Sequence, residues 1–481
     1  MDPILPLPIR LPPHGTRGVL RALHGQLRDA ILDGRLQPGL RLPATRTLAT
    51  ALGISRNTAI AAYDLLLSEG YLTGRRGAGT YVAEGKRREL PRFGMSVAGL
   101  HPFWQKPPPL LARSAARAGD ADLRPGLPDK KLVPFRVWRR ISARALRALS
   151  RTSAMYAEPE GRPPLREAIA SHVSFTRAVS CRAEDIVVTA GAQQAFDLLA
   201  RILVNPGRTV VAVEDPGYPP LRRAFAAAGA EVIGVPVDAE GLRVDRLPQN
   251  VRVIGVTPSH QFPLGTAMSA RRRAELLEFA RMRRAVIVED DYDGEFRFGG
   301  APVEALQTLD RAGVVFYVGT FSKSLFPALR IGFIVSPPWT RNALTAAKQI
   351  VDWHSPVLAQ DTLAAFIAEG HLARHIRKMR RIYGERRARL LEAVGRHPDL
   401  LEALPASAGL HVAARLRAPV RASAVAEAAA RAGLLVDPLS HYGVDGRRAP
   451  NGFALGYGAV PAETIEPAIR RLARLVREGS I

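Results

Sequence analysis

The sequence predicts a multidomain protein. A small N-terminal α+β domain precedes a large α/β domain with a mainly parallel sheet and a small C-terminal α+β subdomain. Three observations lead to this prediction. The chain has 481 residues, which exceeds one ordinary domain. From about residue 120 onward, apolar strand-like runs alternate with amphipathic helical segments, as is typical of βαβ units. A basic segment containing Pro107, Pro108 and Pro109 separates this part from a shorter series of helices.

The domain boundaries follow from these changes in composition. We place the small domain at residues 14–83, a basic proline-containing linker at 84–119, and the large domain at 120–481. Its small subdomain is expected at about 370–481.

Composition excludes several classes of protein. No apolar run reaches the roughly eighteen residues that a membrane-spanning helix needs, so we expect no membrane partner. The proline-rich N-terminus lacks the apolar core of a secretory signal. A single cysteine, Cys181, excludes an internal disulfide framework and a multi-cysteine metal site, so we expect no metal and a cytoplasmic location.

The net charge of +24 is unevenly distributed. Only 7 of the 68 basic residues are lysine, and such an arginine bias can reflect genome composition. Residues 86–151 nevertheless carry 16 basic and 4 acidic side chains, a net charge of +12 and half of the total. This stretch either strengthens attraction to nucleic-acid phosphates or is a solvated surface, and the sequence favours neither interpretation.

The N-terminal part is predicted to form three helices and a hairpin. Apolar residues recur at helical spacing in Val19–Gly34, Thr45–Leu52 and Arg56–Glu69, and Ser55 is suited to cap the third helix. The second and third helices, joined through a turn with a glycine, are typical of a helix-turn-helix. The segment Leu72–Val82 is predicted to form a β-hairpin with a small, basic loop, as in the wing of a winged-helix domain.

The start of the third helix carries residues that can bind DNA. In a helix-turn-helix, the N-terminal residues of the second helix of the motif meet base edges and phosphates. The string "LQPGLRLPATRTLATALGISRNTAIAAYDLLLSEGYLTGRRGAGTYV" resembles the winged-helix domain of the GntR family of bacterial regulators. The resemblance places DNA contacts at Arg46, Ser55, Arg56, Asn57, Thr58, Arg76 and Gly77.

The large domain alternates predicted strands and helices. The strands are expected at Ile186–Thr189, Thr209–Val213, Val251–Thr257, Ala285–Glu289 and Val314–Val318. The helices between them include Ala192–Leu203, Pro219–Ala228 and Ala270–Arg283.

Lys323 is the main candidate for chemistry in this domain. It follows a β-branched strand, on a turn of small hydroxylated residues, and a lysine there can form a Schiff base with an aldehyde cofactor. Pyridoxal 5′-phosphate also needs a carboxylate at its ring nitrogen, a phosphate-binding turn and an aromatic cover. The candidates for these roles are Asp290, the turn of Gly191, Ala192 and Gln193 with Thr320, Ser322 and Arg330, and Tyr218.

The strings "EDDYDGEF" and "GTFSKSLFPALRIGF" resemble fold-type-I aminotransferases, and the resemblance spans roughly Pro125 to Arg477. It implies a PLP-dependent transferase fold with Lys323 as the internal aldimine lysine. It further implies Asp290 at the ring nitrogen, Tyr292 at the ring hydroxyl, Arg330 on phosphate, and Tyr156 of the partner subunit reaching the phosphate. Because one residue of slippage would exchange them, Asp291 and Asp293 remain alternatives to Asp290.

Two departures from the aminotransferase pattern concern the ligand. Phe262 stands where an asparagine usually contacts the cofactor hydroxyl, which leaves His260 or Gln261 as a donor. Ala454 stands where many relatives carry the arginine that pairs with a substrate carboxylate. We therefore expect no sustained transamination. The arginines that could replace the missing one are Arg222, Arg415, Arg447 and Arg448.

A winged helix joined to an aminotransferase-like body resembles the MocR/GabR subgroup of GntR regulators. This resemblance implies a homodimer, often head-to-tail, that binds promoter half-sites in double-stranded DNA and is nucleoid-associated. It also implies that pyridoxal phosphate, alone or with a small amine or amino acid, alters DNA binding. The alternatives are an active aminotransferase with a fused DNA-binding domain, and a structural DNA-binding protein with an empty body.

Overall fold

The computed structural model describes residues 7–12, 18–75, 78–84, 101–106, 108, 119–152, 155–299, 304–444 and 448–479. The chain divides into two compact units, Met1–Leu100 and His101–Ile481, and each is described by itself. The predicted DNA contacts Arg76 and Gly77, most of the predicted linker and Arg447 lie outside the described residues.

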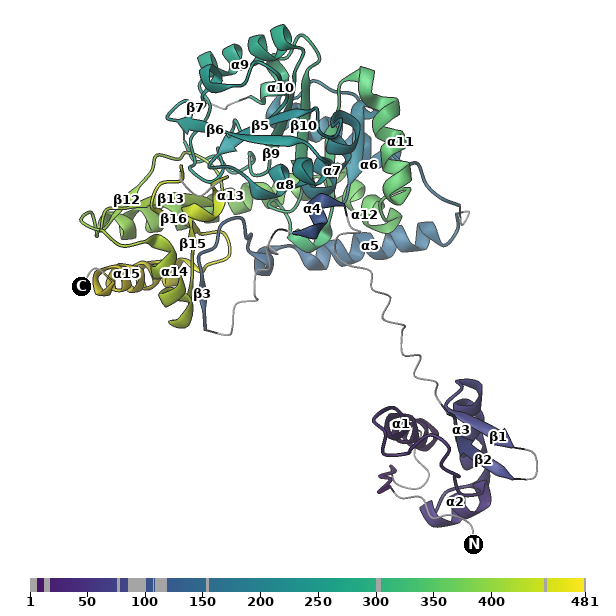
Figure 1. Cartoon of the computed structure of the whole chain (residues 1–481). Helices are drawn as coiled ribbons and strands as arrows, with labels where there is room; N and C mark the ends of the chain where they lie inside the picture. Colours follow the sequence, from purple (N-terminus) through teal and green to yellow (C-terminus); the bar gives the residue numbers. More distant parts are fainter. Residues whose placement is uncertain are drawn as a thin grey trace. The chain divides into compact units, whose positions relative to one another are not determined.

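The first unit consists of three helices and a hairpin (Figure 1). Its elements are α1 (Val19–Leu32), α2 (Thr45–Leu52), α3 (Arg56–Ser68), β1 (Leu72–Arg75) and β2 (Gly79–Val82). Leu23 and Leu27 of α1 pack with Leu48 and Leu66 in one buried cluster, because apolar residues at helical spacing fall on one face of each helix. Gly53, at φ 62°, ends α2 in the left-handed conformation that glycine adopts without strain.

The centre of the second unit is an eight-stranded sheet in the order β4-β11-β10-β9-β8-β5-β6-β7 (Figure 1). The pairs from β10 to β6 are parallel, whereas β11 and β7 run antiparallel to their neighbours. The strands are β4 (Ile186–Thr189), β5 (Val210–Asp215), β6 (Glu231–Asp238), β7 (Gly241–Leu242), β8 (Val251–Val256), β9 (Val286–Asp291), β10 (Val315–Thr320) and β11 (Gly332–Val335).

Helices cover both faces of this sheet. The helices of the second unit are α4 (Pro102–Gln105), α5 (Phe135–Leu149), α6 (Pro163–Arg177), α7 (Ala192–Leu203), α8 (Pro219–Ala227), α9 (Ala270–Arg283), α10 (Leu306–Leu309), α11 (Arg341–Asp352), α12 (Val357–Ala368), α13 (His371–Gly395), α14 (Ala422–Arg431) and α15 (Ala462–Glu478). Val211 and Val213 of β5 pack in the core with α7 and α8, whereas Ala212 packs in the core with α9. Successive strand residues point to opposite faces, so two cores form.

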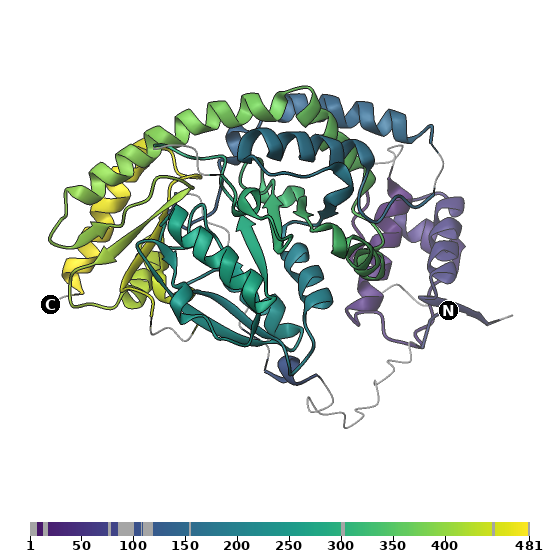
Figure 2. The same ribbon diagram turned by 90° about the horizontal axis from the view of Figure 1, so that it is seen from above.

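A smaller subdomain contains α14, α15 and a four-stranded antiparallel sheet, and α13 connects it to the large sheet (Figure 2). The strand order is β12 (Leu401–Ala403), β13 (His411–Leu416), β16 (Gly452–Gly456), β15 (Asp437–Pro438). A short parallel pair, β3 (Ala121–Asp122) with β14 (Leu434–Leu435), joins the start of this unit to the same subdomain. None of the helices in the described ranges is long and apolar enough to cross a membrane.

Candidate functional site

The predicted site residues meet at the carboxyl ends of the parallel strands. Asp290 lies on β9 opposite Val318 of β10, and the turn with Lys323 follows directly after β10. Gly191 leads from β4 into α7. Open α/β sheets bind ligands at this edge, because loops and helix N-termini converge there.

Lys323 is held by a backbone group from the start of the second unit. Its Nζ donates a hydrogen bond of 2.7 Å to the carbonyl oxygen of Gly126. Gly126 has a φ of 78°, and a Cβ atom at this position would lie only 2.8 Å from Nζ. A side chain at this position would therefore make the lysine shift, and the positive φ also favours glycine. Sequence reasoning missed Gly126, whose local signal is its place in the string Pro125-Gly126-Leu127-Pro128.

Asp290 and Asp291 at the end of β9, and Asp293 just after it, have different partners. Asp291 accepts hydrogen bonds from Arg177 Nε at 2.6 Å and from the Tyr317 hydroxyl at 2.7 Å. Asp293 faces His260. Asp290 is 2% exposed, and its Oδ1 has no hydrogen-bond partner among the described residues. The geometry thus distinguishes Asp290 from the two alternatives, because only its carboxyl group retains an unused buried oxygen.

Burial raises the pKa of Asp290 well above its usual value, and the neighbouring Asp291 raises it further, whereas Lys323 acts in the opposite direction. A cationic ring nitrogen next to this carboxyl would supply the missing counter-charge and hydrogen-bond donor. The orphaned oxygen therefore fits the pyridine nitrogen of pyridoxal phosphate.

Tyr292 is linked to a buried histidine and a carboxylate. His260 Nδ1 lies 2.8 Å from the Tyr292 hydroxyl oxygen and 3.2 Å from both carboxylate oxygens of Asp293. An ionised carboxylate only accepts hydrogen bonds, so Asp293 favours the tautomer of His260 with the proton on Nδ1. This N–H then points towards the Tyr292 oxygen, while the Tyr292 hydroxyl donates to the carbonyl oxygen of His260 at 3.1 Å. Because Nδ1 carries a proton in this tautomer, it cannot accept the Tyr292 proton, which stays available for another acceptor.

Gln261, the other predicted donor, is committed elsewhere. Its amide nitrogen donates to the carbonyl oxygens of Pro216 and Phe262 at 2.9 and 2.7 Å, and its Oε1 accepts from the backbone of Leu264. The amide also lies 3.3 Å from the carboxylate of Glu214, whose pKa burial raises to about 7. Glu214 was missed from sequence because nothing in its local pattern distinguishes it from a surface acid at a strand end.

The predicted phosphate-binding turn has the required local geometry. Gly191, at φ 80°, caps the N-terminus of α7, where the N–H groups of Ala192 and Gln193 have no partner within the helix. Arg330 donates to the carbonyl oxygen of Ala190, and a Cβ atom on Gly191 would lie 3.0 Å from its guanidinium nitrogen. A side chain here would make the guanidinium move slightly, and the positive φ also favours glycine.

Thr320, the last residue of β10, and Ser322 are hydrogen-bonded to each other just before Lys323 in the chain. The Thr320 hydroxyl donates to Ser322 Oγ at 3.0 Å, and the Ser322 backbone N–H donates to Thr320 Oγ1 at 3.2 Å.

Two aromatic residues were also predicted to belong to the site. Tyr218, directly before α8, makes an edge contact with the Phe262 ring at 5.4 Å. Tyr156 is 71% exposed and packs on the Trp353 ring at 4.4 Å.

The position of the missing arginine is filled by apolar packing. Ala454 is fully buried in a cluster with Phe262, Tyr292, Leu439 and Tyr442. The Phe262 and Tyr442 rings meet edge to face at 4.9 Å. No guanidinium extends from β16 into the space beside Tyr292 in the described part of the chain.

The arginines predicted as replacements have other contacts. Arg222 donates to the carbonyl oxygens of Tyr442 and Gly443. Arg448 donates to the carbonyl oxygen of Gly234, and Arg415 lies at the surface, 3.7 Å from the carboxylate of Glu402.

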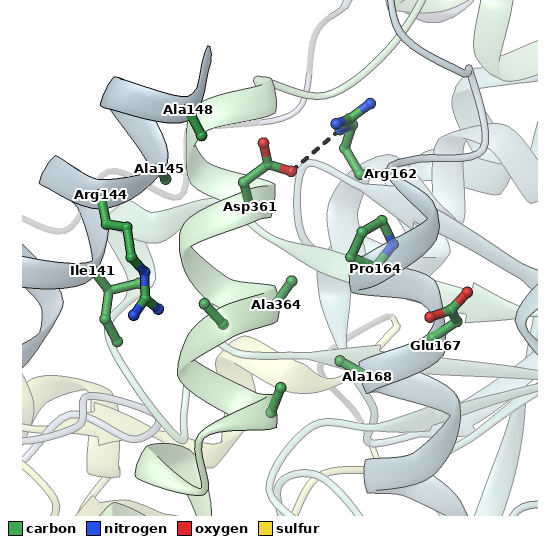
Figure 3. A pocket seen from close by; sticks show the side chains of 12 residues that line it. Ile141, Arg144, Ala145, Ala148, Arg162, Pro164, Glu167, Ala168, Asp361 and Ala364 are labelled. Atoms are coloured by element: carbon green, nitrogen blue, oxygen red, sulfur yellow. Dashed lines mark hydrogen bonds and ion pairs between the residues drawn. The ribbon is translucent and has the colours of Figure 1, made fainter. Parts of the chain in front are cut away.

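A separate hollow of about 660 Å³ lies between α5, α6 and α12 (Figure 3). Its wall consists largely of alanines, and an ion pair of 3.2 Å between Arg162 and Asp361 crosses one end. None of its lining residues belongs to the predicted cofactor site. The hollow is open and offers no nucleophile, so we assign no chemistry to it.

The first unit presents its predicted DNA contacts to solvent. Ser55 Oγ accepts a hydrogen bond of 3.1 Å from the backbone of Thr58, as expected for the cap of α3. Arg46, Arg56 and Asn57 are exposed. Arg56 and Asn57 belong to the first turn of α3, where the helix N-terminus adds a partial positive charge, and Arg46 lies on α2.

Two families match separate parts of the chain. Residues 21–82 match the family described as bacterial regulatory proteins, gntR family, and residues 126–472 match aminotransferase class I and II. A solved structure of Pyrococcus horikoshii kynurenine aminotransferase is similar to the second unit. It has 31% sequence identity and a TM-score of 0.69, and the match covers 75% of this chain and 91% of that one.

Several relatives match nearly the whole chain. The probable rhizopine catabolism regulatory protein MocR of Rhizobium meliloti is 38% identical, over 94% of this chain and 92% of its own length. The HTH-type pyridoxine biosynthesis transcriptional regulator PdxR of Corynebacterium glutamicum is 33% identical, over 98% and 99%. The HTH-type transcriptional regulator TauR of Rhodobacter capsulatus is 32% identical, over 97% and 98%.

Fold and matches together define the class of protein: a GntR-type winged helix-turn-helix fused to a fold-type-I aminotransferase domain with a mainly parallel sheet. Within this class, the chain belongs to the MocR/GabR subgroup of the GntR family.

Proposed function

We propose that this protein is a DNA-binding transcription regulator whose aminotransferase-like domain binds pyridoxal 5′-phosphate through Lys323. Occupancy of that site, by the cofactor alone or with an amino compound, alters DNA binding. The observation that carries the cofactor assignment is the unpartnered, buried Oδ1 of Asp290 at the sheet edge that also holds Lys323. The regulatory role is supported by relatives that are named as regulators and that match this chain over nearly their whole length.

When bound, pyridoxal phosphate supplies an aldehyde carbon that condenses with amines and a ring that accepts electron density. In this chain Lys323 would provide the amine and Asp290 would hold a proton at the ring nitrogen. The Tyr292 hydroxyl, which donates to the His260 carbonyl in the structure, would turn to donate to the ring oxygen. The side chain of Tyr218 covers the ring. The groups that hold the phosphate are the N–H groups of Gly191, Ala192 and Gln193, the hydroxyls of Thr320 and Ser322, the guanidinium of Arg330, and Tyr156 of the partner subunit.

His260 and Asp293 position Tyr292 rather than touch the cofactor in this proposal. The His260 N–H directed at the phenol oxygen strengthens the phenol as a donor, because hydrogen bonds in a chain polarise one another. Tyr292 then compensates for the asparagine that Phe262 replaces.

A regulator requires that its ligand interact differently with two arrangements of the protein. Exposed Tyr156 provides a route for this coupling, since a homodimer would join each cofactor site to the partner's surface. Two winged helices in one dimer would read two half-sites at a fixed spacing.

Sustained amino-acid transamination is the alternative function. The similarity to solved aminotransferases favours it, and the apolar cluster around Ala454 opposes it, because a substrate carboxylate placed there would be desolvated without a counter-charge. We infer that turnover is incidental. Incubation with a panel of amino donors and 2-oxo acids tests this, and sustained rates above about one per second would favour an enzyme.

The regulatory role is tested by DNA binding. Purified protein is titrated against the promoter region of its own gene, with and without pyridoxal phosphate, by fluorescence anisotropy. We expect a cofactor-dependent change in affinity that Lys323→Ala abolishes, while Lys323→Ala keeps the cofactor-free affinity. Equal, salt-sensitive binding to unrelated DNA in every case would contradict the proposal.

A further inference from the structure

Helix α5 has an unusual distribution of charge. Its 15 residues, Phe135–Leu149, include five arginines and no acid. Arg144 pairs with Glu369. The other four are exposed and make no ion pair with the described residues, and we call them the α5 arginine face: Arg136, Arg139, Arg140 and Arg147.

Packing does not require these four arginines. The opposite side of α5 holds the helix on the domain, where Ile141 is buried and the Trp138 ring contacts Phe326 and Phe366. Arg136 and Arg140, one helical turn apart, repel each other, and like charges at this spacing destabilise a helix. The face therefore carries a cost that folding alone does not explain.

Other helices of the same unit pair several of their arginines with acids. Such pairs join residues one turn apart on α7, α9, α13 and α15: Arg201–Asp197, Arg271–Glu275, Arg281–Glu278, Arg389–Glu385, Arg396–Glu392 and Arg470–Glu466. On α5 four exposed arginines share one face of a helix that contains no acid, and this arrangement points to an anionic partner.

We propose that this partner is the phosphate backbone of duplex DNA. The α5 arginine face would bind phosphates next to the DNA sequence that the winged helix recognises. The inference rests on the proposed function, since the first unit must hold DNA. DNA bound by one part of a chain stays at high effective concentration for the other parts. From Arg136 to Arg147 the helix rises about 16 Å, which spans several phosphates of one strand.

The surroundings of α5 fit such a contact. Figures 1 and 2 show the helix along an outer edge of the second unit, where no described element of that unit covers its outward side. Guanidinium groups bind phosphate oxygens in a bidentate manner. The contacts would add affinity without sequence preference, because phosphates carry no base information.

The test compares two full-length variants with equal loss of charge. The first replaces the face (R136Q/R139Q/R140Q/R147Q). The matched control replaces four exposed arginines elsewhere on the second unit for which the described residues offer no carboxylate partner (R208Q/R311Q/R421Q/R431Q). Each protein is titrated with a 200-base-pair duplex from upstream of its own gene and an unrelated duplex of the same length, at about 50 to 300 mM salt.

Each phosphate contact contributes about 0.9 to the slope of log affinity against log salt. We expect the face variant to lower this slope by about 2 to 4 on both duplexes, while the ratio of the two affinities stays constant. The control variant should keep the wild-type slope. Circular dichroism confirms that both variants fold.

Three results would overturn the inference. The first is an unchanged slope for the face variant, and the second is an equal reduction in both variants, which would be an effect of net charge. The third is unchanged DNA binding with lost binding to vesicles of anionic lipid, which would assign the face to a membrane surface. Failure of the proposed function has a different signature, namely that the wild-type protein shows no preference for its own upstream duplex.

Discussion

Asparagine at position 290 or 291 should have opposite consequences for stability and cofactor binding. Asp290 has an unpartnered buried oxygen, and burial disfavours its charged form, a penalty that the neutral amide of asparagine does not carry. Asp291 pairs with Arg177, and their side chains are only 3% and 8% exposed. Removing one partner of a buried ion pair costs about 3–5 kcal/mol. Without cofactor, Asp290→Asn should therefore be as stable as the wild type or more stable, whereas Asp291→Asn should be strongly destabilised.

Cofactor binding should show the reverse order. A charge-assisted hydrogen bond contributes about 1.5–3 kcal/mol, so Asp290→Asn should weaken pyridoxal phosphate binding by about 10- to 150-fold. Absorbance titration measures this affinity, and urea denaturation of the cofactor-free proteins measures stability. If Asp291→Asn lost cofactor affinity while keeping its stability, the assignment of the ring-nitrogen partner would be wrong.

The pH dependence provides a further check on Asp290. Because its pKa is raised in the folded state, the unfolded chain ionises first, and stability falls as the pH rises above the ordinary value of about 3.9. Asp290→Asn removes this contribution, so the free energy of unfolding of the variant should rise relative to that of the wild type as the pH rises above the ordinary carboxyl range. The difference between the two proteins isolates Asp290 from Glu214 and Glu289, whose pKa values are each raised to about 7.

Three other substitutions test separate parts of the site. Gly126→Ala should displace Lys323, because the new Cβ would lie 2.8 Å from Nζ, and borohydride trapping of the cofactor should fall while α-helix content stays constant. Asp293→Asn should remove the carboxylate that favours a proton on His260 Nδ1. The pH midpoint of the bound cofactor's absorbance should then shift upward, and an unchanged midpoint would refute the positioning role. Arg56→Ala should cost about 1–3 kcal/mol of promoter affinity and relax one base position in a binding-site selection.

The elements were predictable because their signals are local. Helices α2, α7 and α9 have the bounds that periodicity and caps predict, since both signals act within a few residues. Strand β9 was predicted to end at Glu289 but continues to Asp291. The apolar pattern stops before the strand does, because the acids at its end are buried by partners elsewhere in the chain, such as Arg177.

The sequence by itself determined the two-part architecture, the lysine on its turn and the exposed start of α3, because chain neighbours set helix periodicity, caps and turns. Only the tertiary structure decided which aspartate keeps a free oxygen, since Arg177 and Asp291 are 114 residues apart. It also decided that the carbonyl of Gly126, 197 residues from Lys323, receives the lysine, and that aromatic rings surround Ala454. Hydrogen bonds and burial depend on groups that meet only after folding, and no local pattern encodes such pairs.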